Sequence, residues 1–160
     1  MSIFKYSEIT NLVMSNEFVT WLHTLPHHND GTLAILVHPF YDINLTPSYL
    51  PALRDVVPRI RAPLLVIEDH DVVRTRERLQ AYGLTAPHHV LRSVPADSTL
   101  VDLDWDDVTR ALRRYGYDHA SLLGGYRNKN PESGCLIGVR DELRRGGISA
   151  SIREDATYGM

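Results

Sequence analysis

Alternation of apolar runs with amphipathic segments is the strongest constraint on the fold of this chain. Two continuous apolar runs, TLAILVH (32–38) and APLLVIE (62–68), have the pattern of strands that are covered on both faces. Three further strands are predicted at HHVLRSV (88–94), HASLLGG (119–125) and ISASIRED (148–155). Strands that alternate with helices predict an α/β fold, a three-layer doubly wound domain around a five-stranded, mostly parallel sheet.

The predicted helices have apolar residues at helical spacing and typical end signals. They cover an N-terminal segment (1–25) and residues 48–60, 71–83, 104–117 and 131–147. With right-handed crossovers, the simplest winding places strands one, two and three to one side and returns strand four beside strand one. The predicted strand order is therefore 3-2-1-4-5, with a switch point between strands one and four, where ligands of such sheets bind.

Length and composition narrow the class of protein further. A chain of 160 residues with 43% hydrophobic residues predicts a single domain (1–160) with an ordinary core. The net charge is −3 and acids and bases are interleaved, which argues against nucleic acid as a partner. No apolar run reaches the length of a membrane span, and the N-terminus lacks the pattern of a secretory signal. The single cysteine fits a reducing compartment, so we expect a cytoplasmic protein.

Polar and ionisable residues follow four of the predicted strands. Strand one is followed by HPFYDIN, strand two ends in EDHD, strand four is followed by GYRNKNPESGC and strand five ends in acids. The carboxyl ends of parallel strands share one edge of the sheet, so these residues predict a cleft there. The candidates from these segments are His38, Tyr41, Asp42, Asn44, Glu68, Asp69, His70, Asp71, Tyr126, Arg127, Asn128, Lys129, Asn130, Cys135, Glu154 and Asp155.

Cys135 has two interpretations. At a helix N-terminus, the partial positive charge favours a nucleophilic thiolate. If Asn130 caps the helix, Cys135 lies in the second turn, where this effect fades; if Ser133 caps it, Cys135 lies in the first turn. The alternative is that Cys135 packs with Leu136 and other apolar residues, and residue type alone favours this alternative.

The other candidates also have structural alternatives. His38 is either a general base or a packed histidine, and Asp42 either accepts a proton or initiates a turn. EDHD lacks the spacing of a metal site, and Asp69 or Asp71 is a competent N-cap for the following helix. Arg127 and its neighbours precede a predicted helix, and this is a weak signal for an anion-binding loop. We expect no metal and no cofactor, since no phosphate-binding or zinc-binding motif occurs.

The C-terminal half, WDDVTRALRRYGYDHASLLGGY…CLIGVRDELRRGGISASIREDAT, resembles the isochorismatase-like family of cysteine hydrolases. The matching features are a strand that ends at Gly124 or Gly125, a helix opened by Cys135, then Gly147 and DAT at 155–157. The resemblance implies hydrolysis of small amides or vinyl ethers by an Asp–Lys–Cys triad, and assembly as a homo-oligomer. This chain has His38 where the family has its aspartate, and it has no lysine between Lys5 and Lys129.

The leading hypothesis is a small-molecule hydrolase of this kind, either divergent or catalytically lapsed. Cys135 would attack a carbonyl carbon, His38 or Asp42 would take its proton, and backbone amides at 134–135 would hold the oxyanion. The alternatives are a non-catalytic module that binds a small anion or nucleotide at the same cleft, and an interaction protein that uses Phe18 and Trp21. The predicted ligand-binding residues are Tyr126, Arg127, Asn128 and Asp69.

Overall fold

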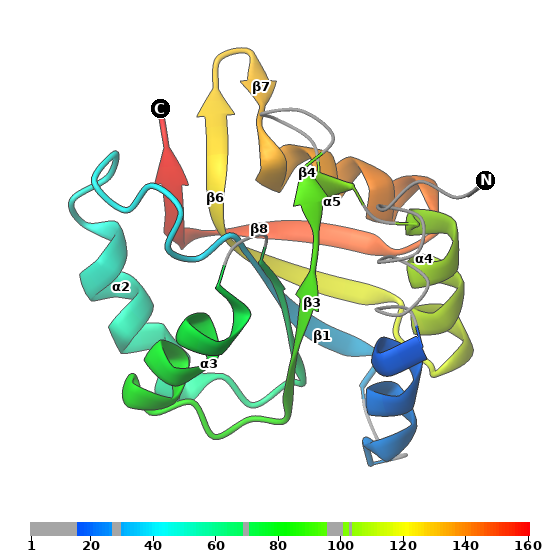
Figure 1. Ribbon diagram of the computed structural model, residues 1–160. Helices are drawn as coiled ribbons and strands as arrows, with labels where there is room; N and C mark the ends of the chain where they lie inside the picture. Colours follow the sequence, from blue (N-terminus) through cyan, green and yellow to red (C-terminus); the bar gives the residue numbers. More distant parts are fainter. Residues whose placement is uncertain (1–15, 27–29, 69–70, 96–100, 103) are drawn as a thin grey trace, which may run out of the picture.

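Five parallel strands form the main sheet of the computed structural model, which describes residues 16–26, 30–68, 71–95, 101–102 and 104–160 (Figure 1). The strands are β1 (Thr32–Val37), β2 (Leu64–Glu68), β3 (His88–Arg92), β6 (His119–Lys129) and β8 (Ser149–Gly159). They lie in the order β3-β2-β1-β6-β8, and each neighbouring pair is parallel. The predicted α/β class and the 3-2-1-4-5 order are thus confirmed, with β1 beside β6.

Two strands extend beyond their predicted ends. β6 and β8 each have 11 residues, and β6 continues through Lys129 into a hairpin with the short antiparallel strand β7 (Glu132–Ser133). The sequence predicts a loop here because residues 126–130 are polar, but polar side chains do not prevent backbone pairing where one face is exposed. A second, two-stranded ribbon of β4 (Val94–Pro95) and β5 (Val101–Asp102) was also not predicted.

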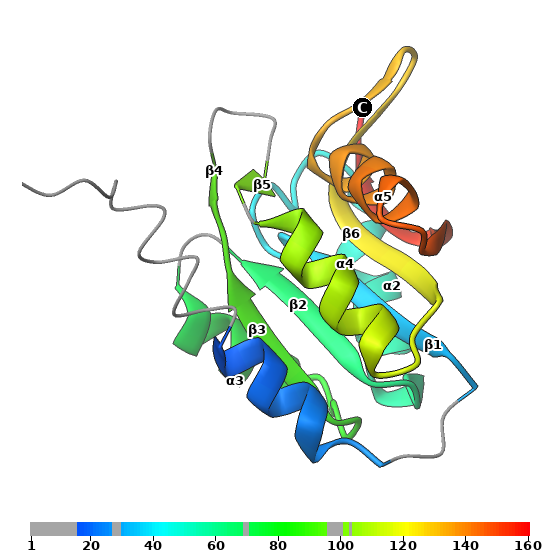
Figure 2. The ribbon, with the colours of Figure 1, turned by 90° about the vertical axis from the view of Figure 1, so that its right-hand side faces the viewer.

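Helices cover both faces of the sheet. A helix at residues 16–24, α4 (Trp105–Arg114) and α5 (Cys135–Arg145) lie on the face turned toward the viewer in Figure 2. The opposite face carries α2 (Tyr49–Val56), the 3₁₀ turn η1 (Val57–Arg59) and α3 (Val72–Ala81). This is the three-layer arrangement expected of a doubly wound fold.

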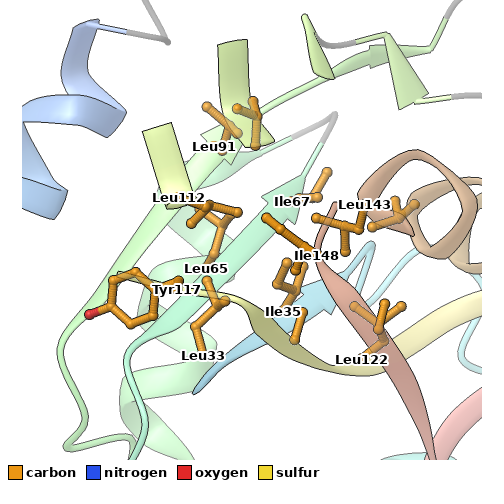
Figure 3. Close-up of a cluster of buried hydrophobic side chains, with 14 of the residues drawn as sticks. Leu33, Ile35, Leu65, Ile67, Leu91, Leu112, Tyr117, Leu122, Leu143 and Ile148 are labelled. Atoms are coloured by element: carbon orange, nitrogen blue, oxygen red, sulfur yellow. The ribbon is translucent and has the colours of Figure 1, made fainter. Parts of the chain in front are cut away.

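The strands explain why two separate hydrophobic clusters form. Successive side chains of a strand point to opposite faces, so Leu33 and Ile35 of β1 pack toward α4 and α5 while Leu36 packs toward α2 and α3. In Figure 3, Leu33 and Ile35 lie in one cluster with Leu112 and Leu143 from those two helices. The continuous apolar runs of β1 and β2 therefore follow from burial on both faces.

Helix starts settle two alternatives from the sequence. The N-cap of α3 is Asp71, one of the two caps predicted for this helix. Its carboxylate accepts a hydrogen bond of 3.0 Å from the backbone N–H of Arg74. The N-cap of α5 is Gly134 at φ 102°, so Cys135 is the first helical residue. Both proposed caps of α5 were wrong, because Asn130 and Ser133 belong to the β6–β7 hairpin.

The N-terminal segment is helical over residues 16–24, and residues 1–15 lie outside the described part of the chain. Phe18 is only 1% exposed and packs with Trp21 against His89 of β3. The aromatic side of this helix therefore faces the chain's own sheet rather than offering the exposed patch that an interaction surface needs. Within the described ranges, none of the helices has both the length and the apolar character of a bilayer span.

Candidate functional site

The switch point lies where β1 and β6 reach the carboxyl edge of the sheet. Val37, the last residue of β1, pairs with Gly124 of β6, and Gly124 pairs with Thr157 of β8. Gly124 has φ 93°, and a Cβ there would overlap the carbonyl oxygen of Val37. Only glycine permits this close approach of the two backbones. The loop after β1 and the extension of β6 separate beyond this point.

His38 is the first residue after β1, and its ring lies toward β3. Its backbone has φ 41°, in the left-handed region, and its N–H donates to the carbonyl oxygen of Ile67 at 2.8 Å. The ring is buried, and Nε2 lies 3.3 Å from the hydroxyl oxygen of Ser93, which follows β3. This contact directs the imidazole over the end of β2, away from β6.

Tyr158 is a residue of the switch point that sequence reasoning missed. It lies on β8, and its hydroxyl donates a hydrogen bond to the carbonyl oxygen of His38 at 2.5 Å. Its ring packs against Tyr49 of α2, with ring centroids 4.7 Å apart. The only signal in the sequence was its place directly after the DAT tripeptide (155–157).

The surroundings of the Tyr158 hydroxyl show which ionisable groups converge on it. Burial raises the pKa of Tyr158, and the nearby negative charges of Cys135, Glu68 and Asp42 raise it further, whereas the backbone amide of Asp42 lowers it. These groups come from the start of α5, the end of β2 and the loop after β1. The charges that act on the Tyr158 hydroxyl therefore belong to residues from three different segments of the chain.

Cys135 stands at the start of α5, in the first turn. A Cβ on Gly134 would overlap the carbonyl oxygen of Tyr126, so the turn into the helix requires glycine. N–H groups of the first helical turn point out of the helix end and give it partial positive charge. The Cys135 side chain is 8% exposed and also contacts the hydrophobic cluster beneath α5. Both of its sequence interpretations thus have a structural basis.

The predicted ligand-binding residues of the β6 extension hold a hairpin together. Arg127 donates to Glu154 of β8 at 2.5 Å and to Glu132 of β7 at 2.8 Å. The Tyr126 hydroxyl donates to the side-chain oxygen of Asn128 at 2.7 Å, and the Asn128 amide donates to Ser133 at 2.9 Å. These contacts join β6 to β7 and β8. Asp69, the fourth residue of this group, lies outside the described residues.

A pocket of 310 Å³ lies beside the switch point, between the loop after β1, the end of β2 and α3. Glu68, a candidate from the sequence, is one of its lining residues. It ends β2, is 4% exposed and accepts a 2.8 Å hydrogen bond from the hydroxyl of Thr75. No group of three His, Cys, Asp or Glu side chains suited to a metal ion occurs within the described ranges.

Comparison with known proteins adds no family to this geometry. A scan against protein-family models and a search of curated proteins both find no match for the chain. The isochorismatase-like resemblance therefore stays a prediction from short motifs. Any function must be argued from the site itself.

Proposed function

We propose that this protein is a cysteine-dependent hydrolase of a small amide or related small molecule, of the isochorismatase-like kind. The observation that supports the proposal is the position of Cys135, the first residue of α5, beside the β1–β6 switch point. Ligands of open parallel sheets bind at this place. A cysteine in the first turn of a helix is in a field that favours its thiolate.

Asp42 is the better candidate for the base that takes the thiol proton. The negative charges of its carboxylate and of Cys135 both raise the pKa of the Tyr158 hydroxyl. The imidazole of His38, the other candidate, has Ser93 as its hydrogen-bond partner on the far side of β2. Of the two bases left open by the sequence, we therefore assign the role to Asp42.

The reaction proceeds by formation and hydrolysis of a thioester. Asp42 takes the proton of the thiol, and Sγ forms a bond to the carbonyl carbon of the amide. The carbonyl oxygen becomes negative and is held by N–H groups at the start of α5. The C–N bond breaks, and the nitrogen leaves with the proton. Water then attacks the thioester, which releases a carboxylic acid and restores the thiol.

Tyr158 is a positioning residue in this scheme. Its hydroxyl holds the carbonyl oxygen of His38, so it fixes the start of the loop that carries Asp42. Among the residues that the structure describes, no lysine takes the place of the family's lysine: Lys129 is exposed at the end of β6, in the hairpin. The proposed mechanism accordingly relies on one carboxylate, the thiol and the helix start.

Ammonia release from a panel of small primary amides and carbamoyl compounds tests the proposal. Wild type should release ammonia from at least one of them, Cys135→Ser should release none, and Asp42→Asn should be slower by about 100-fold or more. Asp141→Asn is a matched control, because it removes a carboxylate that lies on α5 but is exposed to solvent. Equal rates in wild type and Cys135→Ser, with both variants folded by circular dichroism, would contradict the proposal.

A further inference from the structure

The pocket beside α3 has an acidic residue at its floor. Glu68 lines the pocket and is 4% exposed, and the hydroxyl of Thr75, itself buried, donates to the Glu68 carboxylate. A carboxylate only accepts hydrogen bonds, so it recognises N–H donors and cations. The floor is therefore suited to the positively charged end of a ligand.

The outer wall of the same pocket carries the opposite charge. Arg74 and Arg78 are four residues apart on α3, which places their side chains on one face of the helix. The guanidinium carbon of Arg78 lies 3.9 Å from the ring centroid of Phe40, so cation–π stacking orients this side chain at the pocket wall. Guanidinium groups pair preferentially with carboxylate and phosphate oxygens.

The charges that line the pocket favour a carboxylate over a phosphate as the partner of the two arginines. The lining contains two carboxylates, Glu68 and Asp71, and two arginines. Asp71 caps α3 next to Arg74. A phosphate or other multiply charged anion would meet repulsion from both acids, whereas a ligand with one charge of each sign complements both parts. A volume of 310 Å³ lies at the small end of ligand pockets, so the pocket suits a small ligand.

We propose that this pocket binds a small zwitterion, with an ammonium or guanidinium group toward Glu68 and a carboxylate toward Arg74 and Arg78. Tyr41 is 56% exposed and lines the same pocket, where it offers an aromatic face to the body of the ligand. Cys135 is not among the lining residues. Binding is thus independent of the hydrolysis proposed above.

Isothermal titration calorimetry with defined probes tests this site. L-Arginine and L-glutamine are the zwitterionic probes, and acetate, ethylammonium and inorganic phosphate each carry charge of only one sign. At least one zwitterion should bind wild type about tenfold more tightly than every single-sign probe, because only it pairs with both charged parts of the pocket. Cys135→Ala should bind the same zwitterion unchanged, which separates this site from the proposed nucleophile.

Variants on α3 make the test specific. Arg74→Gln and Glu68→Gln should each weaken zwitterion binding about tenfold, since each removes one charge-assisted contact. Arg76→Gln is the matched control: it removes an exposed arginine of the same helix that does not line the pocket. If Glu68→Gln fails to fold, the exposed Arg74→Gln alone decides. The proposal is overturned if no zwitterion binds at millimolar concentration, if phosphate binds as tightly, or if Arg74→Gln matches Arg76→Gln.

Discussion

Acidification should destabilise the folded chain through His89. This histidine lies half-buried on β3, stacked on Trp21 with ring centroids 5.5 Å apart, and its Nε2 has no hydrogen-bond partner among the described residues. Burial lowers its pKa from 6.5 to about 4, and the positive charges of Arg76 and His88 contribute. The folded state therefore holds the neutral ring, and protonation favours the unfolded chain.

The sign and size of the stability change on acidification follow from this difference in pKa. The contribution is fully present above the unfolded pKa of 6.5 and is lost as the pH falls toward 4. Without solvent screening, this difference in pKa would cost roughly 2 to 2.5 kcal/mol of stability between about pH 7 and about pH 4.5. Because the ring is only half-buried, solvent screening reduces the expected loss to roughly 1–2 kcal/mol.

Urea denaturation of wild type and His89→Phe at both pH values isolates the contribution of His89 to the free energy of unfolding. The phenyl ring keeps the stacking on Trp21 but does not titrate, while other groups titrate equally in both proteins. His89→Phe should lose about 1–2 kcal/mol less than wild type on acidification. His119→Gln is the control, because its side chain is 63% exposed. The reasoning is refuted if wild type and His89→Phe lose the same free energy of unfolding.

Two further substitutions test the frame of the switch point by urea denaturation. Gly124→Ala should lower the free energy of unfolding by about 2–4 kcal/mol, because the residue has positive φ and meets the Val37 backbone. Gly138→Ala in α5, where a Cβ has open space, should instead be neutral or slightly stabilising, and equal effects would be evidence against the close approach. Tyr49→Phe should cost about 1–2 kcal/mol, since the Tyr49 hydroxyl donates to the buried carbonyl oxygen of Pro39 at 2.8 Å; an unchanged stability would show that this hydrogen bond contributes nothing.

The sheet order was predictable because its causes are local. Apolar runs such as 32–38 and 64–67 are typical of strands covered on both faces, and helices between such strands favour parallel crossovers. The ends of β6 and β8 were not predictable in this way. Their outer halves are polar, and what extends them is backbone pairing with each other and with β7, which leaves no mark in the side-chain pattern.

The candidate site was predictable in location rather than in detail. The switch-point rule selected the correct edge of the sheet for His38 and Cys135. The helix start at Gly134 was missed because the sequence offered two conventional caps, and the glycine is required by contact with Tyr126 rather than by capping preference. Tyr158 was missed because its role comes from burial and from contact with a loop distant in the sequence. Glu68 was among the candidates, but its burial and its hydrogen bond from Thr75 could not be predicted.

Alkylation of Cys135 by iodoacetamide at neutral pH tests the central claim most directly. The chain has one cysteine, so every label reports on this residue. If the start of α5 presents a thiolate at the switch point, the folded protein should react faster than the urea-unfolded chain, despite its burial, and Asp42→Asn should slow the folded rate. A folded protein that reacts more slowly than the unfolded chain would show a packed core cysteine and would contradict the account.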